Sequence, residues 1–325
     1  MPESRSFLTV DIGGTKTAVA VGFADARIAD RVEFGTSDPR TTMGRILELA
    51  RPLAARHAVE AIGISCGGPL SSRDGLVLGP PNLPGWDRVP VVRALEEGLG
   101  RPAFLENDAN AGALAEWMFG AGRGFQNVVF LTCGTGIGAG LILDGRLYRG
   151  KQDMAGEVGH VRMEADGPVG YFKAGSLEGF ASGGGMLQLA KRRLAEPHPA
   201  TVLDEGPSGE LTGPRIGQAA LDGDAVARSI VETSGRYLGK GLAILIDILN
   251  PECIVLGSLA VRLGELLLGP AREEVQREAL APAWRNCRIV PAELRGHIGD
   301  VAALCAAIYS LKEAETGKEP ADVEQ

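Results

Sequence analysis

The sequence has no long hydrophobic run and no excess of positive charge. No uncharged apolar stretch reaches the roughly 18 residues that a membrane-spanning helix requires. Residues 1–6 are polar, so we expect no signal peptide, no membrane anchor and a cytoplasmic location. Acidic residues (41) outnumber basic ones (33), and the net charge of -8 argues against nucleic acid as the main partner.

Cysteine is scarce and its positions are scattered. The five cysteines are odd in number, have apolar neighbours and share no spacing typical of metal ligands. We therefore expect buried, reduced thiols, as in cytosolic proteins.

Glycine, in contrast, is abundant. Its 46 occurrences in 325 residues are roughly twice the usual share. They follow no Gly-X-Y period, which excludes collagen, and they cluster with Thr, Asp and Asn as in tight turns that approach ligands closely. With 45% hydrophobic residues, the chain can bury a core, and its length suggests about two domains.

Strand-like and helix-like segments alternate along the chain, which predicts an α/β protein. Short apolar runs predict strands over 7–10, 17–22, 61–65, 103–105, 128–131, 140–143 and 253–256. Helical spacing of apolar residues predicts helices over 41–56, 89–99, 109–118, 225–248 and 301–312. Asn250-Pro251 should end the long helix, and Asp144-Gly145 predicts a hairpin turn.

A pattern of strand, glycine turn and strand occurs twice, from Leu8 to Val19 and from Phe130 to Leu141. A duplicated hairpin with glycines at its turn predicts two similar domains that face a shared cleft. Coincidence in a glycine-rich chain is the alternative interpretation.

The two glycine turns are candidate phosphate-binding loops. Residues 11–16 read Asp-Ile-Gly-Gly-Thr-Lys, and successive backbone N–H groups in such a turn can surround an anion. Asp11, at the end of a strand, could hold Mg²⁺ directly or through water. Residues 134–138 read Gly-Thr-Gly-Ile-Gly and offer the same device without the spacing of a dinucleotide fingerprint. Two such turns at one cleft suit a nucleoside triphosphate, although an ordinary hairpin turn explains each of them alone.

Polar residues also follow the predicted strand at 103–105. Ligands of α/β proteins bind at the carboxyl ends of strands, where Asp108 could accept a proton from a hydroxyl and Asn107 could hydrogen-bond a ligand. The alternative for this pair is a helix N-cap. Farther along, Glu157 and His160 lie three residues apart, a spacing compatible with a metal pair, a ligand pair or a surface ion pair.

Taken together and in order, these motifs resemble the ROK family, a bacterial group of repressors and sugar kinases with an actin-like fold. The matches are residues 11–16, Gly67-Gly68-Pro69, Asn107-Asp108-Ala109, residues 134–138, residues 155–160, and Asn250-Pro251-Glu252 followed by Val255-Leu256-Gly257. Each motif is short, but the ordered set is specific and covers most of the chain. The resemblance implies two actin-like (ribonuclease H-like) α/β domains with a ligand cleft between them. The expected domains are residues 1–118 plus 298–325, and residues 119–297.

The resemblance also implies a role for each matching residue. Asp108 would be the catalytic base, and the sugar would be held by Gly68, Asn82, Asn107, Asp108, Glu157, His160 and Glu178. ATP would be held by Asp11, Gly13, Gly14, Thr15, Lys16, Gly134, Thr135, Gly136 and Gly257. Mg²⁺ would bind at Asp11, directly or through water.

The implied activity is ATP-dependent phosphorylation of a hexose, expected to be glucose at its 6-hydroxyl, by a homodimer. Phosphorylation of an N-acetylhexosamine (N-acetylmannosamine or N-acetylglucosamine) and a non-catalytic sugar-binding or regulatory role are the alternatives. A repressor would need a DNA-binding segment, and we expect residues 1–10 to be too few for a helix-turn-helix.

One departure from the family pattern is large. Most members carry a Cys-x-Cys-Gly-x-x-Gly-Cys zinc motif before a Leu-Glu pair, whereas residues 167–178 contain no cysteine. Gly170, Phe172 and Ser176 lie near the expected positions of the thiolates, and zinc needs about four ligands. We therefore expect no zinc, and a segment held by packing of Tyr171, Phe172 and Phe180.

Overall fold

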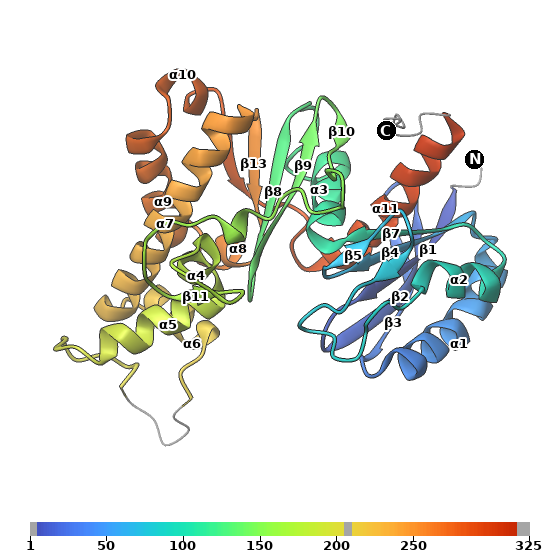
Figure 1. Ribbon diagram of the computed structural model, residues 1–325, viewed down its shortest axis with the longest axis horizontal. Coiled ribbons are helices and arrows are strands. Elements are labelled where there is room, and N and C mark those ends of the chain that lie inside the picture. Colours follow the sequence, from blue (N-terminus) through green and yellow to red (C-terminus); the bar gives the residue numbers. More distant parts are fainter. Residues whose placement is uncertain (1–4, 205–209, 317–325) are drawn as a thin grey trace. The chain divides into compact units, whose positions relative to one another are not determined.

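The computed structural model describes residues 5–204 and 210–316, which form two compact units (Figure 1). Of these residues, unit 1 contains 5–119, 149–155 and 296–316, and unit 2 contains 120–148, 156–204 and 210–295. Residues 1–4 and 317–325, which we assigned to the first domain, lie outside the described residues. The expected domain boundaries stay a prediction. In the described ranges, no helix is both long and apolar enough to cross a membrane.

Unit 1 is built on a five-stranded mixed sheet of order β3-β2-β1-β4-β7. Its strands are β1 (Ser6–Ile12), β2 (Lys16–Phe23), β3 (Ile28–Gly35), β4 (Ala61–Cys66) and β7 (Ala103–Asn107). The chain runs antiparallel from β1 through β2 to β3, and β4 and β7 lie parallel to β1. The carboxyl ends of β1, β4 and β7 therefore meet at one edge of the sheet.

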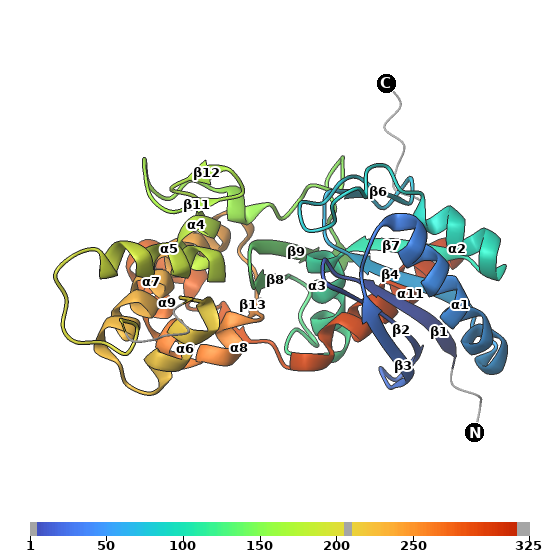
Figure 2. The same cartoon turned by 90° about the horizontal axis from the view of Figure 1, so that it is seen from below.

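Helices cover both faces of this sheet (Figure 2). Alternate residues of β1, such as Leu8 and Val10, pack with the apolar stripes of α1 (Pro39–His57) and α2 (Val91–Leu99). The side chain of Phe7 points to the opposite face of the sheet, where it packs against α11 (Ile298–Glu315). Because side chains alternate along a strand, Asp11 faces the same side as Phe7. The unit also contains α3 (Asp108–Phe119), β5 (Leu70–Ser71) and β6 (Leu76–Val77).

Unit 2 repeats the strand order of unit 1. Its sheet has the order β10-β9-β8-β13-β14, with β8 (Val128–Cys133), β9 (Ile137–Leu143), β10 (Arg146–Leu147), β13 (Cys253–Leu256) and β14 (Arg288–Pro291). The two glycine turns join β1 to β2 and β8 to β9, at equivalent places in the two sheets. The predicted fold class of two related α/β halves is confirmed.

The remaining elements of unit 2 are mostly helical. They are η1 (Val158–His160), β11 (Val169–Gly170), β12 (Lys173–Ala174), α4 (Leu177–Ala181), α5 (Gly183–Leu194), α6 (Gly213–Leu221), α7 (Ala225–Leu249), α8 (Leu259–Leu263), α9 (Glu265–Glu278) and α10 (Ala281–Trp284). The 3-10 turn η2 (Arg295–His297) spans the border with unit 1.

The expected helices are confirmed, with small shifts at their ends. Helix α7 ends at Leu249 because Asn250 adopts a left-handed conformation (φ 45°) and Pro251 cannot continue the helix. Strand β3 was not predicted, because it is an edge strand whose exposed charged residues hide the apolar alternation.

Candidate functional site

In unit 1, a polar ring surrounds two adjacent glycines at the carboxyl end of β4. A Cβ placed on Gly67 would lie 3.5 Å from Asn82 Nδ2 and 4.0 Å from Asp108 Oδ2, and one placed on Gly68 would lie 3.0 Å from Asn107 Nδ2. The two glycines therefore lie directly beside one carboxylate and two amides. These groups can hydrogen-bond several hydroxyls of one ligand.

The structure thus brings together the predicted residues Gly68, Asn82, Asn107 and Asp108, and it adds Gly67, a residue of the Gly67-Gly68-Pro69 motif to which we had assigned no binding role. Asp108 is exposed at the first turn of α3, where its Oδ1 accepts a hydrogen bond from Ala109 N at 2.8 Å. Asn107, just before α3, fills the N-cap role, since its Oδ1 accepts a hydrogen bond from Ala109 N at 3.0 Å, and the second carboxylate oxygen of Asp108 faces Gly67.

A buried ion pair supports the turn between β7 and α3. Glu106 is 2% exposed, and its Oε2 accepts a hydrogen bond from Arg149 Nε at 2.7 Å. Its Oε1 accepts from Asn107 N and from Asn110 Nδ2, each at 3.0 Å. Burial alone would lower the pKa of Arg149, but the Glu106 carboxylate more than compensates and raises it. Sequence reasoning missed this pair, since no motif connects positions so far apart in the chain.

The first glycine turn packs directly beside this ring. A Cβ on Gly14 would collide with the backbone and side chain of Asn82, so only glycine permits the approach. Gly13 N donates to Lys16 O at 2.9 Å, which closes the turn. Lys16 Nζ is ion-paired with Glu33 Oε1 at 2.6 Å, and we keep its contact with phosphate as a prediction.

Asp11 is a carboxylate of unit 1 whose surroundings disfavour its negative charge. Burial raises its pKa to about 6, and the carboxylates of Asp300 and Asp108 contribute in the same direction. Its Oδ2 also lies so close to Gly299 that a Cβ there would clash. A cation near Asp11 would offset this repulsion, and Mg²⁺ commonly binds through one or two carboxylates together with substrate phosphates. The donor set therefore fits the expected metal.

We expect Asp11→Asn to stabilise the metal-free protein above pH 6. The pKa of Asp11 is about 6 in the folded protein, whereas an unperturbed aspartate has a pKa of 3.8. The folded state therefore binds this proton more tightly than the unfolded chain does, and the free energy of unfolding falls as the pH rises from about 4 to about 6. Removing the charge should therefore raise the free energy of unfolding by up to about 3 kcal/mol above pH 6, and should change it little below about pH 4.

Urea unfolding of wild type and variant between pH 4 and pH 8 measures this difference. Asp25→Asn, at an exposed loop carboxylate of the same unit, is the matched control. A gain from Asp11→Asn that stays constant across this pH range contradicts the expectation.

In unit 2, the second glycine turn is fastened by Glu178, the second residue of α4. Glu178 Oε2 accepts a hydrogen bond from Ile137 N at 2.9 Å, and a Cβ on Gly136 would lie 2.6 Å from the same oxygen. Gly183 N donates to Gly134 O at 2.8 Å, so the start of α5 supports the turn as well. The predicted phosphate turn and the predicted sugar ligand Glu178 are therefore neighbours.

Glu157 and His160 complete the predicted set in unit 2, at the two ends of one short turn. Both are exposed, and His160 N donates to Glu157 O at 3.1 Å. Desolvation raises the pKa of Glu157, His160 lowers it, and the Glu178 carboxylate raises it again. The three predicted sugar ligands of this unit thus lie within electrostatic reach of one another.

Gly257 is buried at the end of β13. A Cβ there would lie 3.2 Å from Phe130 Cζ, so the position needs a small residue for packing. The hydroxyl of the adjacent, exposed Ser258 is 3.6 Å from a Cβ built on Gly134. A role for Gly257 toward adenosine stays a prediction.

The segment 167–178, where the zinc motif is missing, forms the β11–β12 hairpin. A Cβ on Gly170 would lie 2.5 Å from Gly179 N and 2.7 Å from Glu178 Cβ. Ser176 Oγ donates to Lys173 O at 3.0 Å and accepts from Gly179 N at 3.2 Å. Close packing and a serine cap therefore hold this segment. In the described ranges, no group of three or more His, Cys, Asp or Glu residues has metal-binding geometry.

The aromatic residues of this segment differ from our expectation. Phe180 is buried and stacks on Tyr237 with centroids 3.7 Å apart, as the packing hypothesis requires. Tyr171 and Phe172, in contrast, are 54% and 91% exposed, so the prediction that they hold the segment by packing is wrong. They form the tip of the hairpin, and a two-residue hairpin tip points its side chains away from the core.

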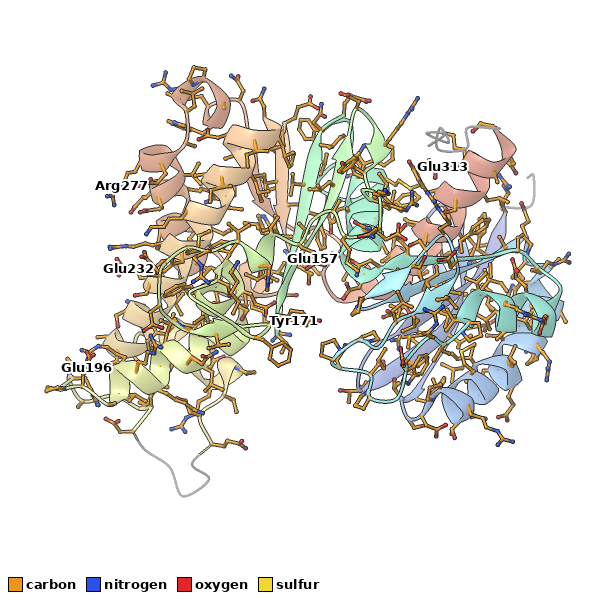
Figure 3. All side chains as sticks on the ribbon, in the orientation of Figure 1. Glu157, Tyr171, Glu196, Glu232, Arg277 and Glu313 are labelled. Carbon is orange, nitrogen blue, oxygen red and sulfur yellow. The ribbon has the colours of Figure 1, made fainter. Side chains whose placement is uncertain are left out.

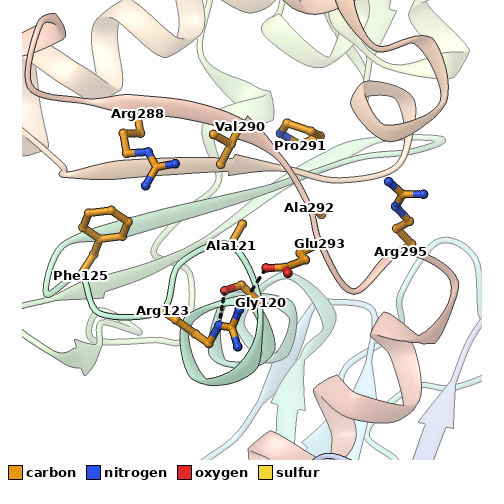
Figure 4. A pocket seen from close by; sticks show the side chains of 10 residues that line it. All are labelled: Gly120, Ala121, Arg123, Phe125, Arg288, Val290, Pro291, Ala292, Glu293 and Arg295. Carbon is orange, nitrogen blue, oxygen red and sulfur yellow. Dashed lines mark hydrogen bonds and ion pairs between the residues drawn. The ribbon is translucent and has the colours of Figure 1, made fainter.

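A cavity of about 600 Å³ in unit 2 contains none of the predicted site residues (Figure 4). Arg123, Arg288 and Arg295 line it together with Phe125 and Glu293. Figure 4 shows that Arg123 is already engaged, with Gly120 O at 3.1 Å and Glu293 Oε2 at 3.6 Å. The motif residues of unit 1 and of unit 2 are therefore considered apart from this cavity.

Known proteins share this architecture. A model of the ROK family matches residues 7–309. The glucokinase of Streptomyces coelicolor is 34% identical over 302 residues, which cover 90% of this chain and 95% of that protein. An N-acetylmannosamine kinase of Escherichia fergusonii is 32% identical over 304 residues, which cover 92% and 97%. A solved structure of a glucokinase from Streptomyces griseus, in complex with glucose and AMPPNP, is 34% identical with a TM-score of 0.79 and coverage of 94% and 99%.

Proposed function

The chain belongs to the ROK family, and from this premise we propose that it is an ATP-dependent hexose kinase that phosphorylates glucose at its 6-hydroxyl. The observation that carries the proposal is the polar ring of Asn82, Asn107 and Asp108 on the glycine floor of unit 1. Such a ring offers a hexose two amides and one carboxylate beside two residues that have no side chain. The glucokinases among its relatives support the choice of glucose.

In this mechanism, Asp108 is the general base. A sugar hydroxyl becomes a good nucleophile only as its proton leaves, and a carboxylate within about 2.6–3.2 Å can accept that proton. Asn82, Asn107 and Gly68 would orient the sugar from unit 1, and Glu157, His160 and Glu178 from unit 2. Correct orientation matters because phosphoryl transfer depends mainly on positioning and on electrostatic stabilisation.

The two glycine turns would hold the triphosphate. Backbone N–H groups of Gly13, Gly14 and Thr15 in unit 1, and of Gly134, Thr135 and Gly136 in unit 2, are suited to anionic oxygens. Lys16 could exchange its ion pair with Glu33 for a phosphate, and Gly257 would approach the adenosine. Asp11 would hold Mg²⁺, which neutralises charge on the phosphates.

The remaining parts of the proposal concern the state of the protein. We propose a homodimer, since closed two-fold dimers are the commonest soluble oligomers. We propose a cytoplasmic location, which accords with five cysteines that form no disulfide, four of them buried. We propose that no structural zinc is needed, because the serine cap and the packing of Gly170 fasten the β11–β12 segment.

A coupled assay of ADP formation against a panel of hexoses tests the activity. We expect Mg²⁺-dependent turnover, with the highest kcat/KM for glucose, and clearly lower values for N-acetylmannosamine, N-acetylglucosamine, fructose and allose. Higher kcat/KM for N-acetylmannosamine would favour the alternative suggested by the related kinase of Escherichia fergusonii. Sugar binding without turnover for any member of the panel would instead identify a non-catalytic sugar-binding protein.

A further inference from the structure

The tip of the β11–β12 hairpin has an unusual composition for its conformation. Tyr171 and Phe172 both have positive φ, 39° and 64°, and they connect the two strands as a two-residue loop. Left-handed conformations are unfavourable for residues with a Cβ, and hairpin loops of this kind strongly prefer Asn-Gly. Strained backbone of this sort is concentrated at functional sites.

The tip also exposes two aromatic side chains to solvent. The rings of Tyr171 and Phe172 are 5.4 Å apart, and neither is buried. The base of the hairpin is nevertheless firmly held, because Gly170 packs against α4 and Ser176 caps it. A rigid base with an exposed aromatic tip is suited to contact with another molecule.

The contacts of the tip indicate which molecule that is. The Tyr171 ring lies edge to face with the His160 ring at 6.3 Å, and Lys173 Nζ donates to His160 O at 2.6 Å. Gly170, the residue before the tip, faces Glu178. Glu157 and Tyr171 are labelled in Figure 3. A hexose held by His160 and Glu178 would therefore lie within reach of Tyr171.

We propose that Tyr171 and Phe172 form an aromatic platform that contacts the C–H face of the bound hexose. The inference rests on the proposed function, because it takes His160 and Glu178 as sugar ligands. Sugar sites combine a few placed polar groups with apolar and aromatic walls. Here the polar groups come from Glu157, His160 and Glu178, and the hairpin supplies the wall.

Alanine substitutions test the platform. Tyr171→Ala and Phe172→Ala should each raise the KM for the preferred hexose about 3–10-fold and leave the KM for ATP unchanged. Tyr148→Ala is the matched control, since Tyr148 is a tyrosine of unit 2 with almost the same exposure, 53%, and no part in the proposed site. An unchanged hexose KM in both tip variants overturns the platform.

A second variant separates binding from folding. Tyr171→Asn combined with Phe172→Gly installs the preferred loop sequence, so it should raise the melting temperature while raising the hexose KM by a similar factor. Loss of affinity in a more stable protein excludes misfolding as the cause. Unchanged hexose affinity, with a dimer that dissociates in sedimentation, would identify the tip as a subunit contact and overturn the proposal.

Calorimetric titration with hexose alone distinguishes this inference from the kinase proposal. If wild type binds a hexose but turns none over, the kinase activity is wrong and the platform is judged by the loss of affinity in the tip variants. If wild type binds no hexose of the panel, the platform is overturned as well.

Discussion

Asp108→Asn is expected to lower kcat for hexose phosphorylation by about 10²–10⁴-fold while hexose affinity changes only a few-fold. Asparagine keeps the size of the side chain and can still hydrogen-bond the sugar, but it cannot accept a proton. The lost interaction develops only in the transition state, so the loss appears in kcat. Ala109 N can still donate to the amide oxygen, which preserves the first turn of α3.

Asp38→Asn is the matched control for this variant. Asp38 also begins a helix of unit 1, where its Oδ1 accepts from Thr41 N at 3.1 Å, and asparagine is an equally good N-cap. Single-turnover kinetics and calorimetric titration separate chemistry from binding. Retention of more than about a tenth of wild-type kcat contradicts the assignment of Asp108 as the base, and lost affinity with preserved kcat would make Asp108 a binding residue.

Arg149→Leu is expected to lower the free energy of unfolding by about 3–5 kcal/mol. It leaves the Glu106 carboxylate buried without its cation, and an uncompensated buried charge is strongly destabilising. Glu106 also accepts a hydrogen bond from Asn107 N, so its displacement should shift the proposed sugar ligand Asn107. We therefore expect kcat/KM for the hexose to fall as well. Urea titration and steady-state kinetics measure the two effects.

The double variant Glu106→Gln, Arg149→Leu checks the cause. It removes both charges, so it should recover a large part of the lost stability, because neutral replacement of a buried pair is often tolerated. Arg93→Leu, which breaks the exposed Arg93–Glu97 pair, should leave stability essentially unchanged. A double variant no more stable than Arg149→Leu would show that packing of the arginine, and not its charge, matters.

The sequence by itself determined the α/β class, the duplicated hairpin and the family. These features depend on local patterns: apolar periodicity, Asn-Pro at the end of α7, and glycine turns after short strands. The strand order, identical in both units, follows from the same duplication. The sequence also supplied the candidate site residues, because each lies in or near a short family motif, and their roles stay predictions.

Tertiary structure alone decided how those residues are supported. The Arg149–Glu106 pair and the approach of Asp300 to Asp11 join positions with no sequence signal, since long-range charge pairing leaves no periodicity. The burial of Phe180 and the exposure of Tyr171 and Phe172 could not be distinguished from the sequence either, because aromatic residues near a glycine suit a core and a hairpin tip equally well. Only the folded chain, in which Gly170 packs against α4, exposes both rings and brings Tyr171 beside His160.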